Sequence, residues 1–168
     1  MKYPHNFLIR FVLCFLPPAV FSLLFTQITI YFSYIMLYVY NPIIEGNILS
    51  IKDLKFEFVD ACIIPYAYYF FWGLCLFTKD ITLKTRIKMV VYGFAMIFAM
   101  NVIRIVLVIY LAINHGLVWF NIIHMFFWKF LSGVYVALVW IILIKIYNIN
   151  SVPFYDDLKT LYKLTKNK

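Results

Sequence analysis

The stretch FAMNVIRIVLVIY, residues 98–110, lies in an apolar run long enough to cross a bilayer, and it carries an amide, Asn101, and a guanidinium, Arg104. An Arg near the centre of a membrane helix costs roughly 2.5 to 3.5 kcal/mol on insertion scales, so it marks a site by default and needs a partner. Asn101 and Arg104 stand three positions apart and therefore share one helix face. We expect the partners of Arg104 to come from other segments at the same depth, where Cys62 and His124 are the reactive candidates.

The composition is that of an integral membrane protein. Of the 168 residues, 65% are hydrophobic and only 13% are charged, which is unusual for a soluble domain. The formal charge is +8, but most Lys and Arg flank apolar runs as topology signals do, so no nucleic-acid partner is expected. Cys14, Cys62 and Cys75 match no zinc spacing and no disulfide framework, so no metal or other cofactor is expected and at least one thiol stays free.

The apolar segments predict an all-α membrane protein with about four transmembrane helices in a single domain, residues 1–168. Pro17-Pro18 opens the first span, and residues 1–16 are expected along the inner interface; one longer helix kinked at the prolines is the alternative. The tail has apolar and Lys residues spaced for an amphipathic helix on the inner surface. The spans are expected at about 18–40, 61–78, 89–113 and 125–147, and the cytoplasmic tail at 148–168.

The periodicity changes between the first two spans. Apolar residues alternate with charged ones from Leu54 to Phe58, and Lys52-Asp53 forms a plausible turn. This pattern predicts a short extracytoplasmic β-hairpin within residues 47–59, and an irregular interfacial loop is the alternative.

Charge in the loops sets the orientation. Lys and Arg gather in residues 79–88 and at both termini, whereas residues 114–124 contain none. The positive-inside rule therefore predicts a multi-pass protein of the cell membrane with both termini cytoplasmic. In this orientation Cys62 and His124 begin helices at the outer face, and Arg104 lies about 23 Å along its helix from the inner end. The three groups are expected to meet near the outer leaflet, in a site that faces outside.

Together these side chains suit acyl transfer. A thiol is a nucleophile only as its thiolate, which the positive charge of Arg104 favours. His124 can take the thiol proton and later deliver a proton to a leaving amine, while Arg104 can also donate to an oxyanion. Asn101 can orient Arg104 or add a donor. The chemistry favoured is cleavage of a peptide bond through a thioester.

Each candidate also has a structural interpretation. Cys62 can be a small buried hydrophobe, and His124 an interfacial histidine bonded to a helix end. Arg104 can be paired with a backbone carbonyl or with Asn101. Four further residues are expected to be structural or peripheral: Cys14, Cys75, His115 and Asp60.

A set of short motifs recurs in order along the middle of the chain: Gly46-Asn47-Ile48, Ala61-Cys62, Asn101-x-x-Arg104-Ile105, Gly116 and His124. With these motifs about half of the chain, from about residue 46 to residue 133, resembles the archaeosortase/exosortase family in a short form. Two features depart from that family. Many members follow the cysteine with Ser or Thr and then Gly, where this chain has Ile63-Ile64-Pro65, and many have extra spanning helices.

The resemblance implies a membrane-embedded thiol protease and transpeptidase. Such an enzyme cleaves a C-terminal sorting signal of membrane-tethered cell-surface proteins, made of a short motif, a transmembrane helix and a basic cluster. It then passes the protein to a new acceptor, for which a lipid is expected. Cys62 is implied as the nucleophile, with Arg104 and His124 as the other catalytic residues and Asn101 in support.

The alternative function comes from a different class. It is a non-catalytic four-helix membrane subunit or small transporter in which Arg104 binds an anion or a partner helix.

Overall fold

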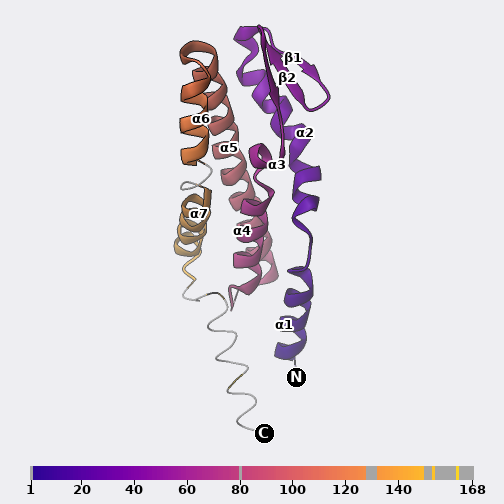
Figure 1. Ribbon diagram of the computed structural model, residues 1–168. Helices are drawn as coiled ribbons and strands as arrows, with labels where there is room; N and C mark the ends of the chain where they lie inside the picture. Colours follow the sequence, from indigo (N-terminus) through magenta and orange to yellow (C-terminus); the bar gives the residue numbers. More distant parts are fainter. Residues whose placement is uncertain (1, 80, 128–131, 150–152, 154–161, 163–168) are drawn as a thin grey trace.

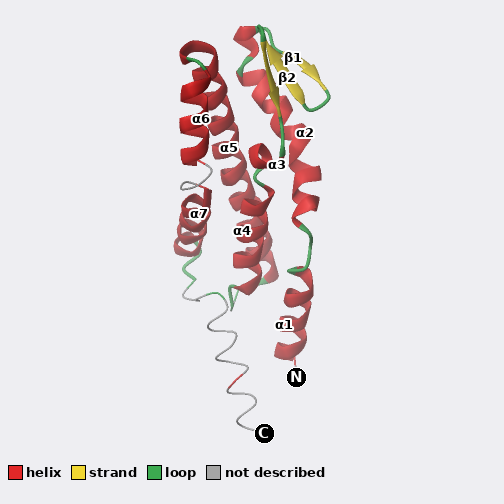
Figure 2. Cartoon of the chain, viewed as in Figure 1, coloured by secondary structure: helices red, strands yellow, loops and turns green. Residues whose placement is uncertain are grey.

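A computed structural model describes residues 2–79, 81–127 and 132–149, together with 153 and 162. The described chain is mostly helical, and a small sheet lies at one end of the helices (Figures 1 and 2). This confirms the expected helical fold in outline. The elements are α1 Lys2–Leu13, α2 Pro18–Met36, η1 Tyr38–Tyr40, β1 Ile43–Glu45, β2 Ile48–Ile51, β3 Leu54–Glu57, α3 Asp60–Ile63, α4 Pro65–Phe77, α5 Leu83–His115, α6 Leu117–Phe126 and α7 Ser132–Ile146.

Two of the described helices, α2 and α5, are long enough and apolar enough to cross a membrane. Helix α5 has 33 residues and is therefore about 50 Å long, which exceeds a hydrocarbon core of about 30 Å. Its first turns carry Lys84, Arg86 and Lys88. Helix α5 is therefore longer than a bilayer core requires, and its basic residues lie in its first turns.

The helix boundaries differ from those expected at several places. Residues 61–78 are split at Ile64 into α3 and α4. Residues 117–146 form α6 and α7, with 128–131 outside the described residues, so that His124 lies in the last turn of α6 and does not open the final helix. Residues 2–13 form a separate helix, α1, followed by a turn, rather than the start of one long helix kinked at the prolines. Most of the expected tail helix lies outside the described residues.

The expected hairpin is confirmed as strands β2 and β3, and its turn falls at Lys52-Asp53 as predicted. Lys52 has a left-handed φ of 54° there. The sheet has a further strand, β1, which pairs antiparallel with β2 through a turn at Gly46. On the inner side of the sheet, Leu49 and Ile51 are fully buried in a cluster that includes Ile105 of α5. This packing fixes the sheet against the part of α5 that carries Arg104.

The other end of the bundle is held by aromatic packing and one close helix contact. Phe25 of α2 stacks on the buried Tyr68 of α4, with ring centroids 4.1 Å apart. Helix α5 approaches α4 at Gly93, where an added Cβ would lie 2.0 Å from the ring of Phe71. Only a residue without a Cβ fits at this contact.

Gly93→Ala should therefore destabilise the bundle. The new methyl group overlaps the fully buried ring of Phe71, and overpacking of this kind costs about 1 to 3 kcal/mol. Gly73→Ala in α4 is the matched control, since an added Cβ there meets no atom within 4 Å. Thermal unfolding of the detergent-purified variants is the measurement. A Gly93→Ala protein as stable as Gly73→Ala would contradict the packing.

The two ends of the molecule differ in charge. The start of α1, the connection from α4 to α5 and the end of α7 lie at one end, and the sheet and the α5–α6 turn lie at the other (Figure 1). The first end carries Lys79, Lys84, Arg86, Lys88 and Lys145. We call it the basic end and the opposite one the sheet end.

Candidate functional site

The helical conformation is interrupted at Ile64, two residues after Cys62. Helix α3 is a single turn, and Ile64 then adopts a left-handed conformation, with φ 54° and ψ 49°, before Pro65 opens α4. A β-branched residue rarely takes this conformation. Since Pro65 has no N–H, the Ala61 carbonyl lacks the donor that a continuous helix would supply, and no backbone N–H of α4 reaches the Cys62 carbonyl.

Asn101 and Arg104 supply the missing donors. Arg104 Nη2 donates to the carbonyl oxygens of Ala61 and Cys62 at 3.1 and 3.0 Å. Asn101 Nδ2 donates to the same Cys62 oxygen at 2.9 Å. Both side chains are buried: Arg104 is 6% exposed and Asn101 is 2% exposed. One face of α5 therefore clamps the turn that presents the Cys62 thiol, and the structural pairing of Arg104 with a backbone carbonyl is observed.

Cys62, Arg104 and His124 line one cavity of about 280 Å³. Its walls come from β3, α3, α5 and α6, which are widely separated in the sequence. Most of the lining is apolar, including Phe58, Val108 and Phe120. Lys55, Glu57, Arg104 and His124 form the polar part of the lining. The residues expected to form a site are thus brought together.

His124 reaches this cavity from α6. Leu117, Phe120 and His124 follow one another at helical spacing and line the same side of it. The imidazole is stacked on the ring of Phe120, with centroids 5.6 Å apart and planes 7° from parallel. Stacking fixes the plane of the imidazole. Within the described part of the chain, no hydrogen bond joins His124 to Cys62, whose sulfur lies 4.0 Å from the carbonyl oxygen of Glu57.

The guanidinium of Arg104 is close enough to the Cys62 thiol and to the His124 imidazole to interact electrostatically with each. Only Nη2 of this guanidinium is bonded to the described protein, which leaves Nε and Nη1 as donors for other acceptors. On Asn101 the oxygen Oδ1 is buried and has no hydrogen-bond partner among the described residues.

His124 lies farther from the sheet end than the sequence suggests. Arg104 is eleven residues before the end of α5 at His115, a distance of about 16 Å along the helix. His124 is seven residues into α6, about 10 Å below its start. The expectation that His124 begins a helix is therefore wrong, because His124 lies in the last turn of α6. Cys62 lies in the single turn of α3, at the start of the helical segment that follows the sheet.

The remaining candidates lie outside the cavity. Cys75 is fully buried in the core of α4, and His115 is the exposed last residue of α5. Asp60 is not a helix cap; it accepts a hydrogen bond from the hydroxyl of Ser22 at 2.5 Å and so ties α3 to α2. The carbonyl of Cys14 accepts a bond from Tyr69. In the described part of the chain, no three His, Cys, Asp or Glu side chains gather as metal ligands.

Two contributors to the site are missed by sequence reasoning. The backbone carbonyls of Ala61 and Cys62 are the partners of Arg104, and the signal for them is Pro65, which removes a helical N–H three residues after Cys62. Phe120 orients His124, and its signal is the i, i+4 spacing of two aromatic rings on one helix.

No family model, curated protein or solved structure matches the chain. The likeness to archaeosortases and exosortases rests on the motif residues alone.

Proposed function

We propose that this chain is a cysteine protease and transpeptidase similar to the archaeosortases and exosortases. One observation carries the proposal: Cys62, Arg104 and His124, which come from three separate segments, line the same largely apolar cavity. A nucleophile, an acid–base group and a fixed cation around one cavity are the parts that acyl transfer requires.

In the first half of the reaction the thiol of Cys62 gives its proton to His124, and the sulfur attacks the carbonyl carbon of the scissile peptide bond. The negative charge moves to the carbonyl oxygen, which accepts hydrogen bonds from the guanidinium nitrogens of Arg104 that the protein leaves unused. The C–N bond then breaks, His124 returns its proton to the departing amine, and a thioester to Cys62 remains.

In the second half a hydroxyl or amine of the acceptor attacks the thioester. His124 takes the proton of that nucleophile, the C–S bond breaks, and the thiol is restored when His124 returns the proton to sulfur. Water in place of the acceptor gives hydrolysis. We propose membrane-tethered surface proteins with a C-terminal sorting signal as substrates and a lipid as the acceptor.

Arg104 serves two purposes in this mechanism. Nη2 holds the α3 turn through the Ala61 and Cys62 carbonyls, and this fixes the position of the nucleophile. The other nitrogens provide charge and donors where the oxyanion develops. Because the guanidinium is planar and rigid, holding one nitrogen also orients the others.

We further propose that the chain crosses the membrane four times, with both termini in the cytoplasm and the sheet outside. Helix α2, the pair α3 and α4, helix α5, and the pair α6 and α7 run alternately up and down the molecule (Figure 1). Their outward faces carry large exposed apolar side chains, such as Leu23, Val91 and Val134, which are 81%, 59% and 58% exposed. Such faces suit lipid better than water. Lys and Arg at the basic end favour a cytoplasmic location for it.

This orientation predicts a labelling pattern. A cysteine placed at Asp53, in the exposed hairpin turn, should react with a membrane-impermeant thiol reagent in whole cells, and one at Lys84 should react only after permeabilisation. Cys14 and Cys62 are replaced by alanine for this test, and Cys75 is fully buried. The reverse pattern would place the sheet in the cytoplasm and refute the proposed orientation.

The function itself is tested by co-expression with proteins of the same organism that end in a short motif, a transmembrane helix and a basic cluster. The expected result is a decrease in substrate size that requires this chain. Failure of every such protein to be cut would remove the proposal.

One observation favours the non-catalytic alternative: two of the hydrogen bonds of Arg104 go to backbone carbonyls, as they would in a purely structural role. A membrane subunit of this kind needs no reactive thiol. Its Cys62 would be replaceable without loss of function, which separates the two candidates.

A further inference from the structure

One edge of the sheet is open beside the cavity that Cys62 lines. The strand order is β1-β2-β3, so β3 pairs with β2 on one side, and no strand in the described part of the chain pairs with its other side. All the residues of β3, Leu54–Glu57, line the cavity. An unpaired edge of this kind is a template for pairing with another extended chain.

The register shows which main-chain groups point to the open edge. In an antiparallel pair, residues that exchange hydrogen bonds alternate with residues whose N–H and C=O point away from the partner strand. The N–H of Phe58 donates to the Asn47 carbonyl at 2.9 Å, so alternate residues of β3, counted back from Phe58 through Phe56, bond to β2. The N–H and C=O groups of Lys55 and Glu57 therefore point to the open edge.

The thiol lies at the end of this edge. Cys62 Sγ is 4.0 Å from the carbonyl oxygen of Glu57, which is one of the outward-pointing groups. A peptide nitrogen that donates to such an oxygen lies about 2.9 Å from it, and neighbouring strands are about 4.8 Å apart. A strand added to β3 thus brings the peptide unit that pairs with the Glu57 carbonyl next to the sulfur.

The walls around the edge suit a single extended chain with apolar side chains. Phe56 packs against the buried cluster that contains Ile105 and Ile109 of α5. Every second side chain of an added strand faces this same wall, which Val108 continues. The ring of Phe120 lies 6.1 Å from that of Phe56, so α6 stands close to β3 and excludes a second sheet.

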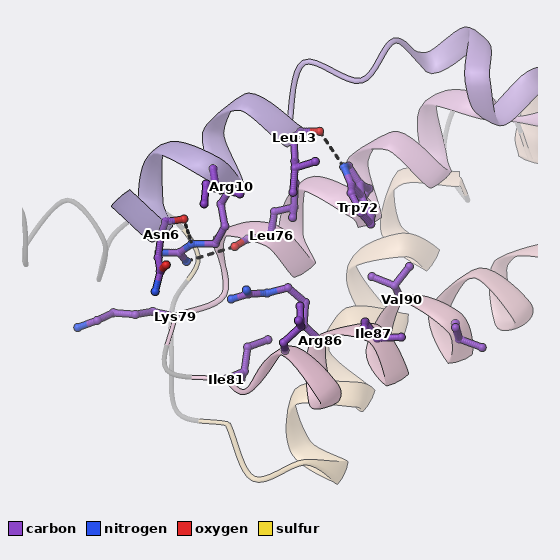
Figure 3. A pocket seen from close by; sticks show the side chains of 13 residues that line it. Asn6, Arg10, Leu13, Trp72, Leu76, Lys79, Ile81, Arg86, Ile87 and Val90 are labelled. Carbon is purple, nitrogen blue, oxygen red and sulfur yellow. Dashed lines mark hydrogen bonds between the residues drawn. The ribbon is translucent and has the colours of Figure 1, made fainter. Parts of the chain in front are cut away.

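A larger cavity, of about 690 Å³, lies at the basic end between α1, α4 and α5 (Figure 3). Its described walls contain no strand, and Arg10 and Arg86 donate there to carbonyls of the α4 end. A chain recognised through its main-chain groups therefore has its site at β3.

We propose that the substrate segment before the scissile bond binds parallel to β3 as a fourth strand, with apolar side chains at alternate positions. One of its residues donates to the Lys55 carbonyl and accepts from the Glu57 N–H, and the N–H of the scissile bond donates to the Glu57 carbonyl beside Cys62. Main-chain hydrogen bonds give such complexes their affinity. The identity of the occupant rests on the proposed function, whereas the open edge does not.

The direction follows from the proposed orientation. Strand β3 runs from the outer turn at Lys52-Asp53 toward Cys62, and a surface protein whose membrane helix follows the scissile bond enters the site in the same direction.

The edge is tested on its own with a peptide attached to the thiol. The full-length Cys14→Ala protein is treated with Thr-Val-Thr-Val-Cys, whose sulfur carries a 2-pyridylthio group. The Cys62 sulfur attacks the peptide sulfur, the S–S bond to the pyridine breaks, and pyridine-2-thione leaves with the proton. Cys75 is fully buried and stays unmodified. Amide hydrogen exchange is then measured residue by residue.

The attached peptide should slow exchange of the Glu57 N–H about tenfold, the effect of one new hydrogen bond. Phe56 is the internal reference, because its N–H already bonds to β2. Thr-Pro-Thr-Pro-Cys is the control peptide, since proline has no N–H for the Lys55 carbonyl. Unchanged exchange at Glu57, or equal slowing by the proline peptide, would overturn the added strand.

Glu57→Pro tests the same edge with substrate, in the Cys62→Ala background. Proline removes the outward N–H and leaves the bonds between β3 and β2 in place. Ile44→Pro is the matched control, because Ile44 pairs with Leu49, whose main-chain groups bond to β3, and so points outward at the far edge of β1. Retention of uncleaved substrate should decrease about tenfold in Glu57→Pro alone, at equal thermal stability.

The added strand and the proposed function fail separately. Equal retention of substrate in the two proline variants, with cleavage by the wild type, would remove the strand and leave the function. Slowed exchange with the attached peptide, without cleavage of any candidate substrate, would remove the function and leave β3 as a site for an extended chain.

Discussion

Replacement of Cys62 by alanine is expected to abolish substrate cleavage, with a loss of at least about a hundredfold, while the variant accumulates in the membrane at the wild-type level. The thiol is half-buried, and its one polar contact in the described chain is a 4.0 Å approach to the Glu57 carbonyl, so its removal disturbs little packing. Cys62→Ser should fail as well, because a hydroxyl is a poor substitute in a site built for a thiolate. Uncleaved substrate should co-purify with both variants.

His124→Ala and the double variant should lose as much as Cys62→Ala. The two side chains act in the same steps, so removing either costs nearly as much as removing both. Removal of the imidazole also leaves Phe120 in place as a wall of the cavity, and substrate binding should persist. Independent, multiplying losses in the double variant would contradict a shared step.

Cys14→Ala is the matched control for Cys62→Ala. Cys14 is also a half-buried free thiol, and its backbone carbonyl, which alanine keeps, accepts a hydrogen bond from Tyr69. The variant should cleave substrate normally. Normal cleavage by a well-expressed Cys62→Ala protein would remove the catalytic interpretation altogether.

The parts of the fold that sequence predicts well are those with a strong periodic signal. The long apolar run around Arg104 gives α5, and the alternation from Leu54 to Phe58 gives the hairpin with its turn at Lys52. Strand β1 is not predicted, because three residues, Ile43–Glu45, are too few to show a period. It forms only because β2 offers a free edge beside it.

Sequence reasoning fails where a break interrupts an apolar run. Residues 61–78 look like one helix, yet Ile64 turns left-handed and separates α3 from α4. Glycine takes a left-handed conformation at low cost, whereas a β-branched residue does not. The clamp from Asn101 and Arg104 stabilises a turn that isoleucine alone would not favour. Tertiary hydrogen bonds of this kind leave no local pattern.

The sequence predicts that Cys62, Arg104 and His124 lie close together, but it does not predict which groups Arg104 contacts or which helix carries His124. An Arg in an apolar helix must find a partner, so Cys62 and His124 are sensible companions for Arg104. The partner found is the backbone beside the thiol, and His124 comes from α6. Helix α6 was missed because residues 114–124, which carry no Lys or Arg, were expected to form the loop before the fourth span.

Arg104→Lys is expected to separate the two purposes of this residue. An ammonium group can still donate to the carbonyls of Ala61 and Cys62, and it keeps the charge that favours the thiolate. It lacks the planar set of further donors that remains for an oxyanion. Membrane abundance and the alkylation rate of Cys62 should therefore stay near wild type, while substrate cleavage falls by roughly a hundredfold or more, the cost of one oxyanion donor.

Arg104→Ala should decrease membrane abundance, the alkylation rate of Cys62 and substrate cleavage together. It leaves the Ala61 carbonyl without its donor, at a cost of about 1 to 3 kcal/mol, and it removes the charge, so abundance and Cys62 alkylation both decrease. Asn101→Ala is the matched control for the clamp, since it removes one of the two bonds to the Cys62 carbonyl and leaves the guanidinium in place. Cleavage should survive there in proportion to abundance. If Arg104→Lys cleaves substrate as fast as wild type, charge and clamping alone are sufficient, and the oxyanion must be stabilised by another group in the cavity.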